Sequence, residues 1–230
     1  MNRTALAIIA SSAAVLVTAG IASPALAATP TGGLAAVQAA GEAATAARIT
    51  ALDTAIPKVS ANAYLSPGDR STILGTLNGD LSAMQSLQAK IAADTDVATA
   101  KTDVQSIYTG YRVYAVAIPQ SLYAASADAL TDSAIPALLT AQHALQAALA
   151  GPDKSKDTPA VDAQMADLAT QITTAQNDSS GVSAAALSVT PSQFNADHSV
   201  LAGTRASIKN AGVAAKAATA DAKAIRAALQ

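Results

Sequence analysis

The chain has 230 residues, 51% of them hydrophobic, with a formal net charge of −2 and no cysteine. No block of like charge is present, which argues against a nucleic-acid-binding protein, and the lack of cysteine excludes disulfides and a lipoprotein anchor. Much of the hydrophobic fraction is alanine, the strongest helix former, and large side chains are few. The composition therefore predicts closely packed helices and not a β-sheet.

Residues 1–27 have the three parts of a secretory signal peptide. Arg3 gives a short positive start, residues 5–22 form an apolar run, and Ala25 and Ala27 are the small residues of a cleavage site. An uncleaved membrane anchor is the alternative, but polar and glycine residues interrupt the run and a proline follows it. No second hydrophobic span or C-terminal sorting signal is found, so we expect a secreted protein, extracellular or associated with the cell wall.

A flexible lead-in is predicted over residues 28–33, followed by a single helical domain over residues 34–230. Apolar residues recur three and four positions apart in the first part of this domain, which predicts a helix. This first helix is expected to end near residue 63.

The second helix is predicted over about residues 67–93, with Ser66 as its N-cap and Pro67 at its first position. Its inward face is a heptad-like row of apolar side chains: Leu74, Leu77, Leu81, Met84 and Ile91. The Asp94-Thr95-Asp96 break that follows could suggest a metal or sugar-nucleotide site. Because no other ligand types stand nearby, it predicts a turn and a helix cap.

The third helix is predicted over about residues 97–117, since its apolar residues keep the three and four spacing. Residues 112–118 could instead be extended, because several of them are β-branched and a proline follows. Pro119 is expected to end this helix and to turn the chain back into a fourth helix, over about residues 120–149. Pro136 should kink or split that fourth helix.

A fifth helix is predicted to start at Thr158-Pro159 after a loop, and to loosen around residues 177–181. A capping box at residues 190–193 opens the longest helix, which is expected to run to about Leu229. Its inward seam carries a run of alanines, which predicts unusually close contact with another helix.

These patterns predict an all-α fold: an elongated antiparallel bundle of five or six long helices with coiled-coil-like, alanine-rich packing. No residue is singled out as catalytic, cofactor-binding or metal-binding. His143 and His198 each stand alone, without the spacing of a metal site, and neither a nucleophile motif nor a phosphate-binding loop is found. We therefore expect a protein that is not an enzyme and has no cofactor.

Residues 107–123 hold four of the five tyrosines. Their helical spacing predicts that most of these rings face the core. If the chain folds back at Pro119, Arg112 and Asp128 come level across the pair, and an arginine among aromatic rings can stack on one and bind a carboxylate. This predicts a structural clamp between two helices, with a site for a small anionic or aromatic ligand as the alternative. The candidate residues are Tyr108, Tyr111, Arg112, Tyr114, Tyr123 and Asp128.

The run from Tyr111 to Tyr114 leads to Pro119 and is followed by Ala127-Asp128. In these residues the chain resembles uncharacterised exported all-helical proteins of actinobacteria, which have no assigned function. The likeness extends loosely over most of the mature chain. It implies a secreted helical protein and no activity.

We expect a secreted, non-catalytic helical interaction or structural protein of the cell exterior or cell wall. Its partner would be an unknown protein or cell-wall component, and self-association through exposed heptad faces is a further expectation. Neither nucleic acid nor a stable membrane anchor after signal cleavage is expected. One alternative is a small-molecule carrier with a pocket near the tyrosines. Another is a membrane-active helical protein, although its apolar stretch is shorter than the roughly 20 residues of a membrane span.

Overall fold

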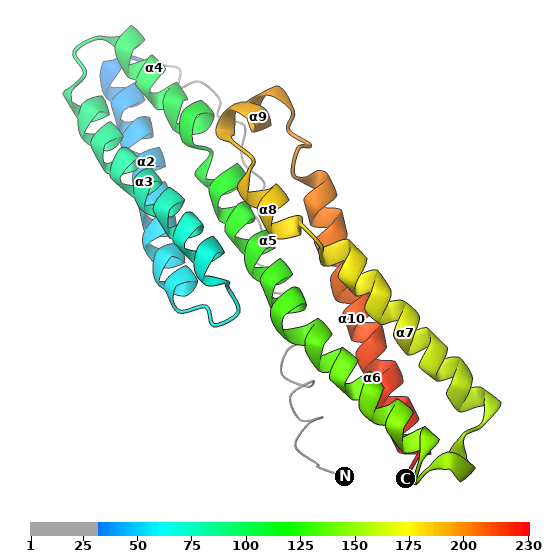
Figure 1. Ribbon diagram of the computed structural model, residues 1–230. Coiled ribbons are helices and arrows are strands. Elements are labelled where there is room, and N and C mark those ends of the chain that lie inside the picture. The colour runs from blue at the N-terminus through cyan, green and yellow to red at the C-terminus, as the bar shows by residue number, and fades with distance from the viewer. Residues whose placement is uncertain (1–31) are drawn as a thin grey trace. The chain divides into compact units, whose positions relative to one another are not determined.

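The computed structural model describes residues 32–230, so the predicted signal peptide and residues 28–31 of the lead-in lie outside the described residues. Every regular element in the described part is a helix, which confirms the predicted all-α helical bundle (Figure 1). Within the region expected to form one domain, contacts gather into two compact units. The N-terminal unit comprises residues 32–124 and 185–201, and the C-terminal unit comprises residues 125–184 and 202–230.

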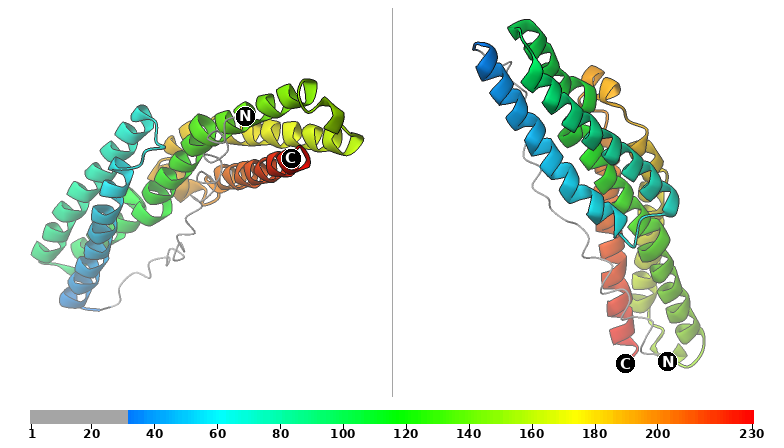
Figure 2. Two further views of the ribbon diagram at one scale, coloured as in Figure 1. Left: turned by 90° about the horizontal axis from the view of Figure 1, so that it is seen from below. Right: turned by 90° about the vertical axis from the view of Figure 1, so that its left-hand side faces the viewer.

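Three helices make most of the N-terminal unit. α2 (Leu34–Ser60) and α3 (Pro67–Ala93) lie side by side as an antiparallel hairpin, and α4 (Val97–Ser106) packs against both (Figure 1, Figure 2). Arg70 closes the hairpin, because its guanidinium donates hydrogen bonds to carbonyl groups of the connecting loop. Buried apolar side chains from all three helices fill the space between them: Val37, Leu52, Leu77, Met84, Ile91 and Val104.

The predicted starts of α3 and α4 are confirmed. Ser66 caps α3 by accepting a hydrogen bond from the backbone N–H of Asp69 at 3.2 Å, and a proline takes the first helical position. Asp96 caps α4 in the same way, with the N–H of Thr99 at 2.9 Å. The break that begins at Asp94 is therefore a turn followed by a helix cap.

The inward face of α3 differs in part from the predicted row. Three residues of that row are buried and two are only partly buried: Leu77, Met84 and Ile91, and Leu74 and Leu81. A second row on the same helix completes the buried face, with Ile73 and Leu87 one heptad to either side of Asp80. A carboxylate therefore interrupts one of the two apolar rows.

Close approach between helices is needed at Gly41 of α2. A side-chain carbon built on this glycine would lie 2.6 Å from Val104 Cγ2 and 2.9 Å from Ile91 Cγ2. Both neighbours are β-branched, so their side chains have little rotational freedom to move away. Gly41 therefore sets how closely α2 approaches α3 and α4.

The chain beyond α4 alternates between π-helical and α-helical segments. η1 (Ile107–Tyr111) and η2 (Val113–Ala117) are π-helical, α5 (Ile118–Ala129) is α-helical, η3 (Leu130–Ala134) is again π-helical, and α6 (Ile135–Ala150) follows. The predicted helical character up to Ala117 is confirmed, apart from a single left-handed residue between η1 and η2. The extended alternative for this stretch is wrong.

Two prolines explain where the π-helical segments η2 and η3 occur. Pro119 comes directly after η2 and the first residue of α5, and Pro136 holds the same position after η3 and the first residue of α6. A proline lacks the N–H and clashes with the carbonyl four residues earlier, which in both cases lies inside the wider π-helical turn. The split expected at Pro136 is confirmed. The hairpin expected at Pro119 is wrong, because α5 continues through this residue.

The core of the C-terminal unit lies between α7 (Pro159–Ser179), α10 (Ala202–Ala228) and α6. The alanine seam predicted for the last helix is buried together with its larger members: Ile208, Ala211, Ala215, Ala218, Ala222, Ile225 and Leu229. An alanine is sealed from water only where a neighbouring helix comes close, so this seam requires the close contact that the sequence predicted. Gly181, with φ of +69°, lies in the short connection between α7 and α8 (Val182–Leu187).

The capping box of α9 (Pro191–Ala196) is confirmed. Thr190 Oγ1 accepts a hydrogen bond from Gln193 N at 3.2 Å, and Gln193 Oε1 accepts one from Thr190 N at 2.8 Å. The expectation of one long helix from here to the C-terminus is wrong. Asp197 Oδ1 accepts hydrogen bonds from Ser199 N at 2.8 Å and Oγ at 2.6 Å, which gives the backbone an alternative to helical bonding.

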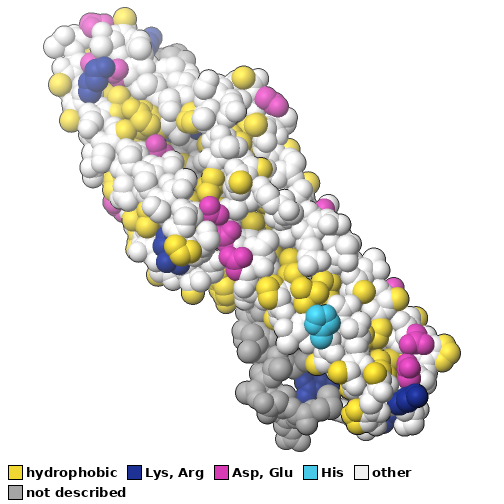
Figure 3. Space-filling view, viewed as in Figure 1, with side chains coloured by type: hydrophobic (Ala, Val, Ile, Leu, Met, Phe, Trp, Pro, Cys, Tyr) yellow, Lys and Arg dark blue, Asp and Glu magenta, His cyan; other side chains and the backbone are white. Residues whose placement is uncertain are grey.

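Charged side chains are sparse on the surface. They make up 13% of the chain, and Figure 3 shows them scattered over the face in view, singly or in small groups. Val213 of α10, at 61% exposure, is the exposed large apolar side chain among the described residues. The outer faces of the helices therefore present mostly small and neutral polar groups.

Gly41→Ala should destabilise the protein by about 1–2 kcal/mol. Overpacking at this contact costs about 1–3 kcal/mol, which outweighs a gain in helix propensity of at most about 1 kcal/mol. Gly75→Ala and Gly79→Ala are matched controls on α3, since an added carbon at either meets nothing within 4 Å. Both should be neutral or stabilising by up to about 1 kcal/mol. Urea unfolding followed by circular dichroism measures all three, and a stabilised Gly41→Ala variant would contradict the expectation.

Candidate functional site

The predicted site residues divide between the two units. The four tyrosines and Arg112 belong to the N-terminal unit, whereas Asp128 belongs to the C-terminal unit and is buried. The hairpin that would bring Arg112 level with Asp128 is absent, because α5 continues through Pro119. All four rings are partly buried, so the expectation that most of them face the core holds only in part: Tyr108, Tyr111, Tyr114 and Tyr123.

An arginine of α2 stands between two of these rings. The guanidinium carbon of Arg48 lies 4.6 Å from the ring centroid of Tyr108 and 5.0 Å from that of Tyr114. Tyr114 Oη donates a hydrogen bond to the carbonyl of Ala47 at 2.8 Å, and Arg48 Nη1 donates one to the carbonyl of Ala44 at 2.8 Å. We call Arg48, Tyr108 and Tyr114 the Arg48 clamp, since together they hold α2 against η1 and η2.

Opposing electrostatic effects act on the guanidinium of Arg48. Burial lowers the pKa of Arg48, and the phenol groups of Tyr108 and Tyr114 act in the opposite direction. An arginine keeps its charge at every physiological pH, so the cation remains available to both ring faces. Arg48 was not among the residues predicted from the sequence. Its one local signal was its place beside Ile49, which belongs to a row of apolar residues at helical spacing.

Arg112 makes a different set of contacts from those predicted. Its backbone is left-handed, with φ of 51° and ψ of 37°. Its Nε donates a hydrogen bond to Asn195 Oδ1 at 2.7 Å, and its guanidinium lies 5.3 Å from the ring centroid of Phe194. Asn195 Nδ2 in turn donates to the carbonyl of Thr109 at 2.7 Å. α9 is thereby bound to the left-handed residue and to the η1 segment that precedes it.

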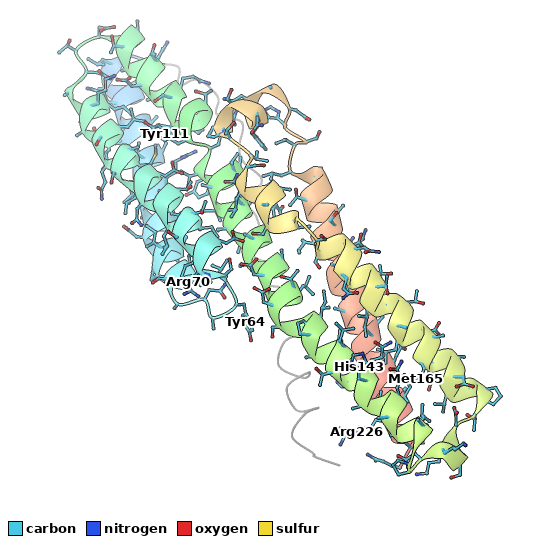
Figure 4. All side chains as sticks on the ribbon, viewed as in Figure 1. Tyr64, Arg70, Tyr111, His143, Met165 and Arg226 are labelled. Carbon is cyan, nitrogen blue, oxygen red and sulfur yellow. The ribbon has the colours of Figure 1, made fainter. Side chains whose placement is uncertain are left out.

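The remaining two tyrosines lie outside these contacts. Tyr111 lies in η1 beside the end of α4 (Figure 4). Tyr123 of α5 packs on a small apolar cluster centred on Val116, Val189 and Leu201. They therefore differ from the two rings of the Arg48 clamp, and the tyrosine-rich stretch does not form one site.

Gln120 is a second polar residue that the sequence analysis missed. Its side chain is 6% exposed, and its Nε2 donates hydrogen bonds to the carbonyl of Ala186, at 2.8 Å, and to that of Val189. Carbonyl groups at the end of a helix lack partners within the helix. Gln120 therefore donates hydrogen bonds to carbonyl groups at the end of α8 and holds this end against α5.

Asp80 is a third polar group of interest, because it interrupts an apolar row of α3. Its Oδ2 atom is buried and has no hydrogen-bond partner, and burial raises the pKa of Asp80 to about 6. No charged neighbour contributes to that shift, so the group is a desolvated carboxylate and not a member of an ion pair.

The chemistry of these groups is hydrogen bonding and ring stacking, which positions helices. Within residues 32–230, no set of three or more His, Asp or Glu side chains is arranged to hold a metal ion. In the same part of the chain, no helix has both the length and the apolar character to cross a membrane.

Comparisons of the chain with protein families, with curated proteins and with solved structures found no match.

Arg48→Met should lower the free energy of unfolding by about 1–2 kcal/mol, because the cation between two partly buried rings is lost while the apolar stem is kept. Arg205→Met on the exposed face of α10 is the matched control and should change stability by less than about 0.5 kcal/mol. Urea unfolding of both variants measures the difference. Equal effects of the two substitutions would show that the clamp does not stabilise the fold.

Asp80→Asn should stabilise the protein above pH 6 by about 1 kcal/mol, a value reduced for the screening of a partly exposed group. The folded-state pKa of Asp80 lies above its unfolded value, so its favourable contribution is present below about pH 4 and is lost as pH rises through about 6. The gain should therefore shrink toward pH 4. Asp53→Asn, on the exposed side of α2, is the control for urea unfolding between pH 4 and 8. A gain from Asp80→Asn that is the same at all pH values would contradict this reasoning.

Proposed function

We propose that the mature chain is a secreted, non-catalytic helical protein that binds a protein or polymer of the cell exterior or cell wall. The proposal is based on the contacts of three polar side chains inside the N-terminal unit. Arg48 stands between two rings, Arg112 binds Asn195, and Gln120 binds the end of α8. Each of them holds one segment to another, which supports a scaffold that presents its outer faces to a partner.

Export is supported by the sequence. The three-part signal of residues 1–27 and the resemblance to exported actinobacterial proteins both favour it. Cleavage after Ala27 would release the helical part with a short lead-in.

The outer faces of the helices are the surfaces that a partner would meet. The apolar rows of α3 and α10 lie inside their own units, so they give no support to self-association through exposed heptad faces. Charged groups on the face seen in Figure 3 are scattered, and alanine, serine and threonine occupy much of the exposed helix surface. Such a surface favours binding by hydrogen bonds over a large area rather than through one charged or apolar patch.

A small-molecule carrier is the less supported alternative. It would need the tyrosine rings to stack on a ligand. The guanidinium of Arg48 already lies against the rings of Tyr108 and Tyr114, and Tyr123 packs on its own apolar cluster.

Expression of the full-length chain in an actinobacterial host should place a chain without residues 1–27 in the medium or the cell-wall fraction. Mass spectrometry checks the cleavage, and Ala27→Lys should prevent it, because the cleavage site needs a small residue. Protein recovered from the medium should co-sediment saturably with isolated cell walls.

Walls stripped of protein by protease separate the two kinds of partner. Binding that survives stripping indicates the wall polymer, and binding that is lost indicates a wall protein. A chain that stays in the cytoplasm, or one that binds neither preparation of walls nor any secreted protein, would contradict the proposal.

A further inference from the structure

The backbone of Arg112 is held in an unfavourable conformation. It is the only residue other than glycine with a left-handed φ between residues 32 and 230. In this conformation the Cβ atom crowds the following carbonyl, so such a residue persists only where its surroundings hold it. The neighbouring contacts of Arg112 therefore have to offset this strain.

The segments on either side of Arg112 also depart from the regular α-helical form. η1 precedes it and η2 follows it, and both are π-helical. π-helical turns are rare and usually occur singly inside α-helices. We call residues 107–117 the Arg112 joint. Two π-helical segments around one left-handed residue interrupt a path that would otherwise be helical from Val97 onward.

The Arg48 clamp depends on this interruption. Tyr108 and Tyr114 are six positions apart. In a straight α-helix each residue turns by about 100°, so these side chains would point about 120° apart. Across the Arg112 joint, both rings instead lie within 5.0 Å of the guanidinium carbon of Arg48. The contact with α2 therefore stabilises the interrupted state and not the straight one.

α9 holds the Arg112 joint from another side. Asn195 accepts a hydrogen bond from the side chain of Arg112 and donates one to the carbonyl of Thr109, both at 2.7 Å. The ring of Phe194 lies under the guanidinium. α9 is itself short and mostly exposed, and non-helical residues flank it at both ends. A segment with these properties can detach from the Arg112 joint without unfolding the helices that it contacts.

We propose that the Arg112 joint is a two-state element that α9 holds interrupted. When the contacts of α9 are removed, Arg112 takes the right-handed helical conformation. The helical path then runs without a break from residue 97 into η2, whose wider turn Pro119 still requires. The Arg48 clamp opens in the same step, because its two rings no longer share a face. A molecule that binds α9 and holds it off the Arg112 joint shifts the equilibrium toward the right-handed state. This inference does not depend on the identity of the partner in the proposed function.

Nuclear magnetic resonance on the isotope-labelled mature protein tests the proposal. The coupling between the amide and α protons of residue 112, with its Cα shift, reports the sign of φ. The ring-current shift of the Arg48 δ protons reports the Arg48 clamp. Asn195→Ala removes the hydrogen bonds of α9 to Arg112 and to Thr109. Arg112→Ala removes the side-chain contacts with Asn195 and Phe194 and keeps the Cβ strain, whereas Arg112→Gly removes both those contacts and the strain.

Arg112→Ala and Arg112→Gly should give different results. Asn195→Ala and Arg112→Ala should reduce the left-handed population about tenfold or more, and the Arg48 ring-current shift should fall with it. Arg112→Gly should keep both signals. Asn177→Ala, at an exposed asparagine of α7, is the control and should change neither.

Two outcomes overturn the proposal. In the first, Asn195→Ala keeps a left-handed residue 112 and an intact Arg48 clamp. In the second, Arg112→Ala and Arg112→Gly lose the clamp signal equally, so the strain has no effect. If Arg112→Ala fails to fold, the Asn195→Ala result decides alone.

Discussion

Small side chains fill much of the core, and this constraint governs the packing. A buried methyl group stabilises a fold far less than the roughly 1.5–3 kcal/mol of a buried leucine or isoleucine, and alanines gain dispersion energy only where two helix backbones come close. α10 meets this requirement at Ala211, Ala218 and Ala222, which are 0% exposed, and α2 meets it at Gly41. Close contact tolerates little displacement, so the helices need a well-defined arrangement.

Directional contacts provide that arrangement where apolar volume is small. Arg48 holds α2 to the segment around Arg112, Asn195 holds α9 to the same segment, and Gln120 holds the end of α8. The prolines of α5 and α6 act on the backbone instead of on side chains. Wider helical turns before them let the chain continue where an ideal helix would clash. Each of these polar side chains therefore connects two segments of the fold.

Features set by neighbours in sequence were predictable, and features set by distant residues were not. The caps at Ser66 and Asp96 follow from short local patterns, and the buried seam of α10 follows from periodicity. By contrast, Asn195 and Arg112 are 83 positions apart, and no local pattern pairs them. The hairpin predicted at Pro119 was wrong for another reason. A proline suits both a turn after a helix and the first turn of a new one, so its position alone could not distinguish a hairpin from a continuing path.

Asp80 and Gly41 also bear on how the chain finds one alignment among several. Helices with repetitive small-residue faces can slide past one another by a heptad and still bury similar apolar area. Such a slip would move the carboxylate of Asp80 into the place of Ile73 or Leu87, and would set Gly41 against a residue other than Ile91. In the misaligned pair the carboxylate of Asp80 would be desolvated at a new position, and the space beside Gly41 would not be filled by Ile91. Asp80 weakens the native core, but it raises the free energy of the wrong alignments as well.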